Sequence, residues 1–521
     1  MNELMHDGFL LPHDYKPERL CRVLGGEQRC QVTATSDFSL KFYDSFDWRL
    51  HAAGLRLLRI AAGDGAELRL KSAAGGPPIQ ATVHAEEPAW PADLPAGELR
   101  DTVAGLLSMR VLLCLATVQC ESTELRILND DGKTVARLQF LRMRCDAEGL
   151  SEPRALWPRL RVSGVKGYES EQKELLRLFS EEMEWPIAPD CLFDETITAV
   201  GREPGDYSSK LDVALQPDQP AIAALRKILL TLLDTLERNV PGTRADLDSE
   251  FLHDLRVATR RTRSALSQVK RVLPDTVVET YKERFAWLGQ ITGPTRDLDV
   301  FLLELPRYRA SLPAAMARDL DPLEDLLKTT HKKEQALLKR RLGSAEMGKL
   351  LKEWRALLEA ETPPGEPGLL ADQPVDQVVS QRIWKMYRRV IKAGRAIDVD
   401  GPAEAMHELR KDCKKLRYLI EFFRGIYPAD EVKSLIKALK ELLDNLGEFQ
   451  DLEVQADKLR AFAGDFPPDD PKSRSTIMAI GALVADLLRH QQAAHGRFAE
   501  CFARFDSAHN RDGYKALFRQ P

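Results

Sequence analysis

The sequence predicts an α+β protein of several domains, in which an N-terminal antiparallel β domain precedes an all-α domain. Three observations predict this class. Short stretches of alternating apolar and polar residues, separated by Gly, Pro and Asp, fill the first 200 positions. Beyond about position 218 the pattern changes to long stretches with a period of 3.6 residues. One helical stretch then occurs twice, 154 positions apart, which indicates an internal duplication.

The composition is that of an ordinary globular protein. The chain has 521 residues, eight cysteines and a formal net charge of −5, so any electropositive surface must be local. The cysteines have neither CxxC nor zinc-site spacing, so we expect reduced thiols, no metal and no cofactor. The N-terminus lacks a signal-peptide pattern, and the most apolar run, Val103 to Val118, is short and contains Arg110. We therefore expect a cytoplasmic protein without a membrane span.

Residues 1–200 carry the strand signals. Clear examples are Leu55–Ile60 and Glu67–Lys71. Leu125–Leu128 and Val135–Phe140 are joined by the turn Asn129–Gly132, which predicts a hairpin. These strands predict one antiparallel β domain.

Several of these strands place basic side chains on one face of the predicted sheet. These residues are Arg56, Arg69, Lys71, Arg126 and Arg137. They either form a solvated outer face or line a basic lumen or cleft, and the pattern alone leaves both alternatives open. Between the strands, residues 97–118 predict a helix that packs on the sheet.

The stretch FYDSFDWRL at 42–50, followed by AGLR at 53–56, resembles the CYTH family of triphosphate tunnel enzymes. The stretch GVKGYE at 164–169 resembles the closing segment of that family. The resemblance implies a β-barrel and a metal held by an ExExK motif on the first strand. Residues 27–35 occupy that place and lack the motif. We therefore expect a degenerate β domain that has lost catalysis but still binds phosphate, with no catalytic residues and no metal ligands.

The remaining chain predicts the helical domain. Residues 201–218 are rich in Gly and Pro and predict a linker after the β domain at 1–200. The helical domain is expected at 219–518, with one repeat at about 219–361 and the other at about 371–518. Each repeat predicts a four-helix antiparallel bundle, and a pseudo-twofold axis relates the two.

The repeated stretch is HDLR at 253–256 and HELR at 407–410. The offset of 154 positions holds without gaps well beyond these four residues. It also relates Pro274 to Pro428, Gly293 to Gly447, and RDLD at 296–299 to QDLE at 450–453.

Each copy predicts a helix with one cationic and one apolar face. In the first copy, expected to run to Pro274, the cationic face carries His253, Arg256, Arg260, Arg263, Lys270 and Arg271. In the second copy it carries His407, Arg410, Lys414, Arg417 and Arg424. Like charges at these spacings repel one another, so the faces predict an anionic ligand. The alternative is that Asp297, Asp299, Asp451 and Glu453 neutralise the cations internally.

The expected ligand is a linear polyanion made of phosphate. Each stripe would span roughly 25–30 Å, and arginine binds phosphate in a bidentate manner. The stripes carry few aromatic rings, which makes nucleic acid unlikely. The predicted contacts are His253, Arg256, Arg260, Arg261, Arg263, Lys270, Arg296, Arg388, Lys392, His407, Arg410, Lys414, Lys415, Arg417, Arg424, Lys433 and Lys437.

HDLRVATRRTRSAL and HELRKDCKKLRYL, with RDLDV and QDLEV, resemble the CHAD family, the conserved histidine α-helical domain, over about 215–518. The resemblance implies duplicated helical bundles that bind inorganic polyphosphate and localise to polyphosphate granules. We expect such a granule protein here. One alternative is a CYTH-type inorganic triphosphatase or polyphosphatase whose helical domain holds the substrate. Another is a nucleic-acid or protein scaffold. The role of the two motif histidines stays open.

Overall fold

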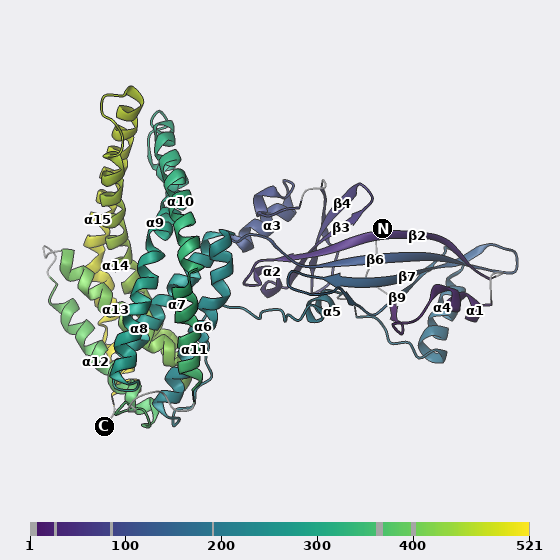
Figure 1. Cartoon of the computed structure of the whole chain (residues 1–521), viewed down its shortest axis with the longest axis horizontal. Coiled ribbons are helices and arrows are strands. Elements are labelled where there is room, and N and C mark those ends of the chain that lie inside the picture. Colours follow the sequence, from purple (N-terminus) through teal and green to yellow (C-terminus); the bar gives the residue numbers. More distant parts are fainter. Residues whose placement is uncertain are drawn as a thin grey trace. The chain divides into compact units, whose positions relative to one another are not determined.

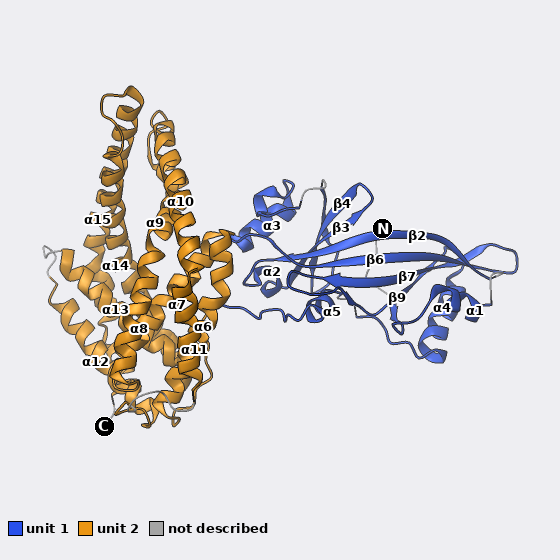
Figure 2. Ribbon diagram, in the orientation of Figure 1, with its two compact units in different colours: residues 1–208 blue, residues 209–521 orange. Residues whose placement is uncertain are grey.

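The computed structural model describes residues 8–25, 29–83, 87–189, 192–360, 368–397 and 403–519. The chain divides into two compact units, Met1–Ser208 and Ser209–Pro521 (Figure 2). Part of the segment at 27–35, where the ExExK motif was sought, lies outside the described residues.

The first unit is built on one antiparallel sheet, as predicted (Figure 1). The strands are β1 (Gly8–Leu10), β2 (Cys30–Asp44), β3 (Leu55–Ala62), β4 (Gly65–Ser72), β5 (Ile79–Val83), β6 (Leu113–Leu128), β7 (Thr134–Asp146), β8 (Arg154–Ala155) and β9 (Arg159–Gly164). Their order is β1-β9-β7-β6-β2-β3-β4-β5, with β8 paired to β7. The predicted hairpin turn joins β6 and β7, where the Gly132 amide donates to the Asn129 carbonyl at 2.9 Å.

The helices of this unit are short. They are α1 (Pro17–Val23), α2 (Arg49–Ala52), η1 (Pro91–Asp93), α3 (Glu98–Leu107), α4 (Glu169–Arg177), η2 (Leu178–Glu182) and α5 (Leu192–Ala199). The prediction of a helix at 97–118 is confirmed only as far as Leu107, where α3 ends, and it is wrong for the residues beyond. Ser108 adopts a φ of 55°, which breaks the helix, and β6 begins at Leu113. The run at 111–118 belongs largely to a buried central strand, whose continuous apolar pattern imitates a buried helix.

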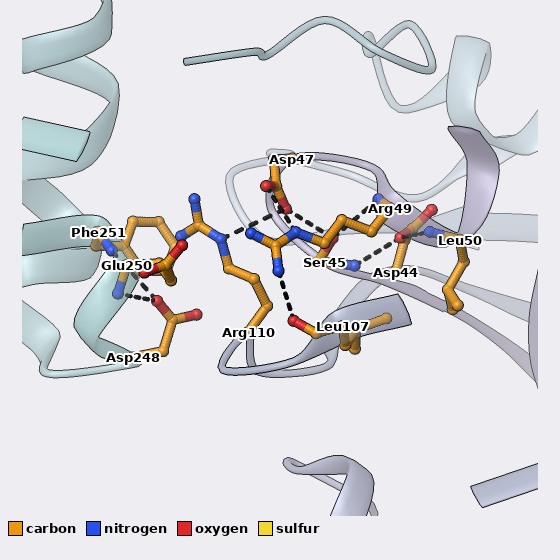
Figure 3. Close-up of polar contacts among 10 residues, drawn as sticks. All are labelled: Asp44, Ser45, Asp47, Arg49, Leu50, Leu107, Arg110, Asp248, Glu250 and Phe251. Atoms are coloured by element: carbon orange, nitrogen blue, oxygen red, sulfur yellow. Dashed lines mark hydrogen bonds and ion pairs between the residues drawn. The ribbon is translucent and has the colours of Figure 1, made fainter. Parts of the chain in front are cut away.

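The FYDSFDW stretch forms a hydrogen-bonded turn at the end of β2 (Figure 3). The buried carboxylate of Asp44 accepts hydrogen bonds from the amides of Leu50 (2.9 Å) and His51 (2.8 Å). Nearby, Asp47 pairs with Arg49 at 2.9 Å and with the buried Arg110 at 3.4 Å. These contacts give the motif that resembles the CYTH family a structural role, because they fix the chain between β2 and α2.

The second unit is all-helical (Figure 1). Its helices are α6 (Ala221–Ala245), α7 (Ser249–Gln268), α8 (Asp275–Ile291), α9 (Gly293–Ser311), η3 (Ala317–Leu320), α10 (Asp321–Leu342), α11 (Ala345–Glu359), α12 (Val375–Arg395), α13 (Ala403–Phe423), η4 (Arg424–Ile426), α14 (Ala429–Ala463), α15 (Pro471–Phe505) and α16 (Ala508–Phe518). Helices α6, α7 and α8 begin 154 positions before α12, α13 and α14, so the duplication sets the element boundaries.

Reciprocal backbone hydrogen bonds relate the two repeats. The Ala221 amide donates to the Gln373 carbonyl at 2.9 Å, and the Val375 amide donates to the Gln219 carbonyl at 3.0 Å. The offset of 154 converts one bond into the other, as a local twofold axis requires. A continuous leucine-rich core cluster then buries side chains from both repeats. Within the described residues, no helix is long and apolar enough to cross a membrane.

Candidate functional site

Helices α7 and α13 pack against each other and place their basic residues away from the core. The Asp248 carboxylate caps α7, because Oδ1 accepts hydrogen bonds from the amides of Glu250 (2.9 Å) and Phe251 (3.2 Å). Leu255 on α7 and Leu409 on α13 are fully buried. Each helix therefore has the apolar and cationic faces that the helical wheel predicts.

The two cationic faces meet at Arg260 and Lys414, which are equivalent positions of the two repeats. Burial, followed by the charges of Arg410 and Arg260, lowers the pKa of Lys414 to about 8. Arg260 is exposed, and its guanidinium forms no ion pair within the described ranges. The axis of the duplication thus brings together two cations that repel each other.

A cavity of about 260 Å³ opens beside Arg260, between α7 and α8. It is lined by Arg256, Thr259, Arg260, Arg263, Ala286, Gly289 and Gln290. The Arg256 guanidinium is held in place because Nη1 donates to the Gly289 carbonyl at 3.0 Å and to the Thr292 hydroxyl at 2.9 Å. Three guanidinium groups therefore line one small space, which suits a phosphate group.

Gly289 lies beside the Arg263 guanidinium. A Cβ atom at position 289 would lie 3.4 Å from Nη1 of Arg263, at the edge of ordinary van der Waals contact. Thr259, Gly289, Gln290 and Thr292 were not among the residues predicted from the sequence. Gly289 lies on α8, which packs against α7, and Thr292 lies between α8 and α9, so neither belongs to the motif itself.

His253 positions Arg296. Nδ1 of His253 accepts a hydrogen bond from Nη2 of Arg296 at 3.1 Å, which assigns the imidazole proton to Nε2. Burial and the charge of Arg296 lower the pKa of His253. Arg296 also lies 3.9 Å from Asp299, whose other oxygen is 2.8 Å from Nε2 of His331. His253 is thus one end of a series of polar contacts, through Arg296 and Asp299 to His331, that fixes the position of the Arg296 guanidinium.

The second repeat departs from this arrangement. Gln450 replaces Arg296, and its Oε1 accepts a hydrogen bond from Arg410 at 2.7 Å. His407 has no hydrogen bond to any other described residue. The two histidines therefore have different surroundings despite their equivalent positions.

Internal neutralisation of the cations is partial. Arg410 pairs with Asp451 at 3.0 Å, and Arg417 pairs with Glu421 at 2.6 Å. Asp297 pairs with Lys458, outside the two stripes. By contrast, Arg256, Arg260, Arg263 and Lys414 have no ion pair within the described part of the chain. We call Arg256, Arg260, Arg263, Arg410, Lys414 and Arg417 the cationic surface.

Several residues that the sequence predicts as polyphosphate contacts lie outside the cationic surface. Arg261 donates to the Ser209 carbonyl at 3.1 Å and pairs with Glu421 at 3.4 Å. Lys415 pairs with Asp412 at 2.9 Å. Arg424 belongs to η4, beyond the end of α13, and pairs with Asp212 at 3.0 Å. Lys433 and Lys437 are exposed on α14, and Arg388 and Lys392 line a groove formed by α12 and α16.

The first stripe is shorter than the sequence predicts. Helix α7 ends at Gln268 rather than at Pro274, and Arg271 adopts a φ of 65°. Lys270 and Arg271 therefore lie in a turn beyond the helix. The helical part of the stripe, from His253 to Arg263, rises about 15 Å.

The basic face of the N-terminal sheet is a cleft. One cavity of about 650 Å³ is lined by Arg126, Arg137 and Arg161, and a second pocket is lined by Arg69 and Lys71. Arg69 is only 2% exposed. The described residues contain no group of three or more His, Cys, Asp or Glu side chains arranged to hold a metal ion.

Residues 227–460 match the model of the CHAD domain family. The CHAD domain from the plant Ricinus communis is 26% identical and aligns with 59% of this chain and 96% of its own, with a TM-score of 0.47. PptA from Streptomyces chartreusis is 18% identical and aligns with 54% of this chain and 99% of its own, with a TM-score of 0.43. No curated protein matches the sequence. The match to the family model identifies a CHAD domain at residues 227–460, where the duplicated histidine motifs predicted it.

Proposed function

We propose that the protein binds long chains of inorganic polyphosphate through the cationic surface of α7 and α13. One observation carries this proposal: the duplication brings Arg260 and Lys414 near each other, and burial, followed by the charges of Arg410 and Arg260, lowers the pKa of Lys414 to about 8. Such a surface lowers the stability of the free protein and gains energy when a polyanion binds. The CHAD resemblance points to the same ligand.

A bare phosphate chain fits this surface better than nucleic acid does. The cavity between α7 and α8 is lined by guanidinium groups and contains no aromatic ring. Proteins that hold single-stranded nucleic acid stack bases on aromatic side chains. On this surface charge is the dominant means of recognition, so binding weakens steeply as salt concentration rises.

Competition in an electrophoretic mobility assay tests the proposal. Labelled polyphosphate of about a hundred phosphates is bound to the full chain, and unlabelled polyphosphate or single-stranded RNA of equal charge is added. We expect polyphosphate to compete at least about tenfold better than RNA, because RNA spaces its charges more widely and lacks its stacking partners here. Equal competition would indicate a general polyanion scaffold instead.

We further propose that polyphosphate binding directs the protein to polyphosphate granules. A fluorescent fusion should form foci that disappear when the cell is depleted of polyphosphate. Foci that persist without polyphosphate would show that another partner places the protein.

The N-terminal cleft supports a second candidate function, a triphosphatase or polyphosphatase whose CHAD domain holds the substrate. The observation that favours it is the cavity of about 650 Å³, whose lining includes Arg126, Arg137 and Arg161. Phosphate release from tripolyphosphate with Mg²⁺ or Mn²⁺ distinguishes the two functions, because pure binding produces none.

A further inference from the structure

Helices α12 and α16 form an open groove of about 580 Å³. Its lining comes from these two helices alone, so it contains no residue of the cationic surface. The lining residues are Trp384, Tyr387, Arg388, Ile391, Lys392, Arg395, Arg511, Asp512 and Lys515. The volume lies in the range of small-molecule sites, which is roughly 300–1,000 Å³.

The groove has an excess of positive charge. Arg395 pairs with Asp506 through Nε at 2.7 Å, and Arg511 lies 3.1 Å from the same carboxylate. The other cations, Arg388, Lys392 and Lys515, are exposed and have no ion pair within the described residues. Asp512 is the acid that lines the groove beside them. Three cations against one carboxylate favour an anionic ligand.

The groove also contains aromatic rings, which the cationic surface lacks. Trp384 is half-buried and stacks on Tyr387, with ring centroids 5.6 Å apart. Tyr387 in turn stacks on the buried Tyr514 at 3.9 Å, so the aromatic stack is rigidly supported. The Tyr387 hydroxyl is buried and has no hydrogen-bond partner in the described structure.

The first repeat provides an internal comparison. Positions 230, 234 and 237 of α6 correspond to 384, 388 and 391 of α12, and they carry Leu, Asp and Glu. There, Arg355 of α11 pairs with Asp234 and with Glu237, each at 2.6 Å. The same helix face is thus closed by ion pairs in one repeat and left open with unpaired cations in the other.

We propose that the groove between α12 and α16 binds a nucleotide that carries two or three phosphates. The base lies against Trp384, and the phosphates contact Arg388, Lys392 and Lys515. A flat base would stack on the exposed part of the aromatic rings. The phosphates would neutralise the three cations through charge-assisted hydrogen bonds. This site is separate from the polyphosphate surface and does not depend on it.

Equilibrium dialysis of the full chain with radiolabelled ATP tests the site, with long-chain polyphosphate binding measured on the same samples. Trp384→Leu introduces the residue of the first repeat, and Arg388→Gln with Lys392→Gln removes two cations. We expect each variant to lose about tenfold or more in affinity for ATP, which is the size of loss seen when a base-stacking ring is removed. Each should keep its affinity for polyphosphate within about twofold of the wild type. The matched control is Arg238→Gln, which removes the exposed cation equivalent to Lys392 from the first repeat.

The variants of the cationic surface complete the test. Arg260→Ala with Lys414→Ala should leave ATP binding unchanged and weaken polyphosphate binding. The inference is overturned if this double variant loses ATP while Trp384→Leu retains it, because ATP would then bind as a short polyphosphate. It is also overturned if inorganic triphosphate displaces ATP as well as unlabelled ATP does, because the base would then contribute nothing. Thermal unfolding of each variant shows whether it remains folded.

Discussion

Removal of the two cations that meet at the repeat axis is the most direct perturbation of the cationic surface. In the double variant Arg260→Ala and Lys414→Ala, we expect much weaker binding of long-chain polyphosphate and no loss of folding stability. Arg260 is exposed, and Lys414 has a lowered pKa because burial and neighbouring cations disfavour its charge. If Arg260 and Lys414 instead stabilised the fold, the double variant would be less stable than the wild type.

The expected loss of polyphosphate affinity and the change in its salt dependence follow from the number of cations that contact the ligand. The cationic surface has six, and each cation that binds a single-stranded polyanion contributes about 0.7 to the slope of log K against log salt. Six contacts give a slope of about −4, and the double variant should give about −3. A hydrogen bond to a charged group contributes about 1.5–3 kcal/mol, so two lost contacts cost at least about 3 kcal/mol, or about a hundredfold in affinity.

The sign of the stability effect comes from Lys414. Its pKa of about 8 in the folded protein lies below the ordinary lysine value. The unfolded chain therefore binds more protons between the two values, and stability rises with pH across that window. Below it the charged Lys414 opposes folding, so its removal at pH 7 should keep or raise the melting temperature.

The assay is a titration of polyphosphate at several salt concentrations, with thermal unfolding measured in parallel. The control is Lys349→Ala with Lys328→Ala, which removes the same charge from ion pairs of exposed lysines on α11 and α10. Exposed pairs contribute little to stability, so this control should bind nearly as the wild type does. If the Arg260 and Lys414 variant binds within about twofold of wild type at low salt, or unfolds several degrees earlier, the assignment of the surface is wrong.

Three further predictions concern single residues. Polyphosphate affinity should fall between pH 7 and pH 9 because the bound anion favours the charged form of Lys414, and Lys414→Arg should remove most of that fall in the same titration. His253→Ala should weaken binding more than His407→Ala does, because only His253 holds an arginine; equal losses would contradict this role. Gly394→Ala should lower the free energy of unfolding by about 2 kcal/mol in urea, since its Cβ would overlap the Phe502 ring, whereas Gly481→Ala, in open space, should not destabilise the protein.

The sequence by itself determined the features that depend on local periodicity. Alternation predicted the antiparallel sheet, and the offset of 154 predicted the duplicated helices with their cationic and apolar faces. These patterns repeat within a few residues, so they can be recognised without knowledge of distant contacts. The same local rule failed at 111–118, because the nearly continuous apolar run VLLCLATV has no alternation that distinguishes a strand from a helix.

The tertiary structure alone decided which charges act together. Residues 260 and 414 are adjacent only because the two repeats pack about an axis, and Arg296 reaches His253 only through the packing of α9 beside α7. Packing likewise directed Arg261 to Glu421, and Arg388 to the groove with α16. Electrostatic energy depends on distance and burial in space, whereas helical periodicity gives only the direction of each side chain about its own axis.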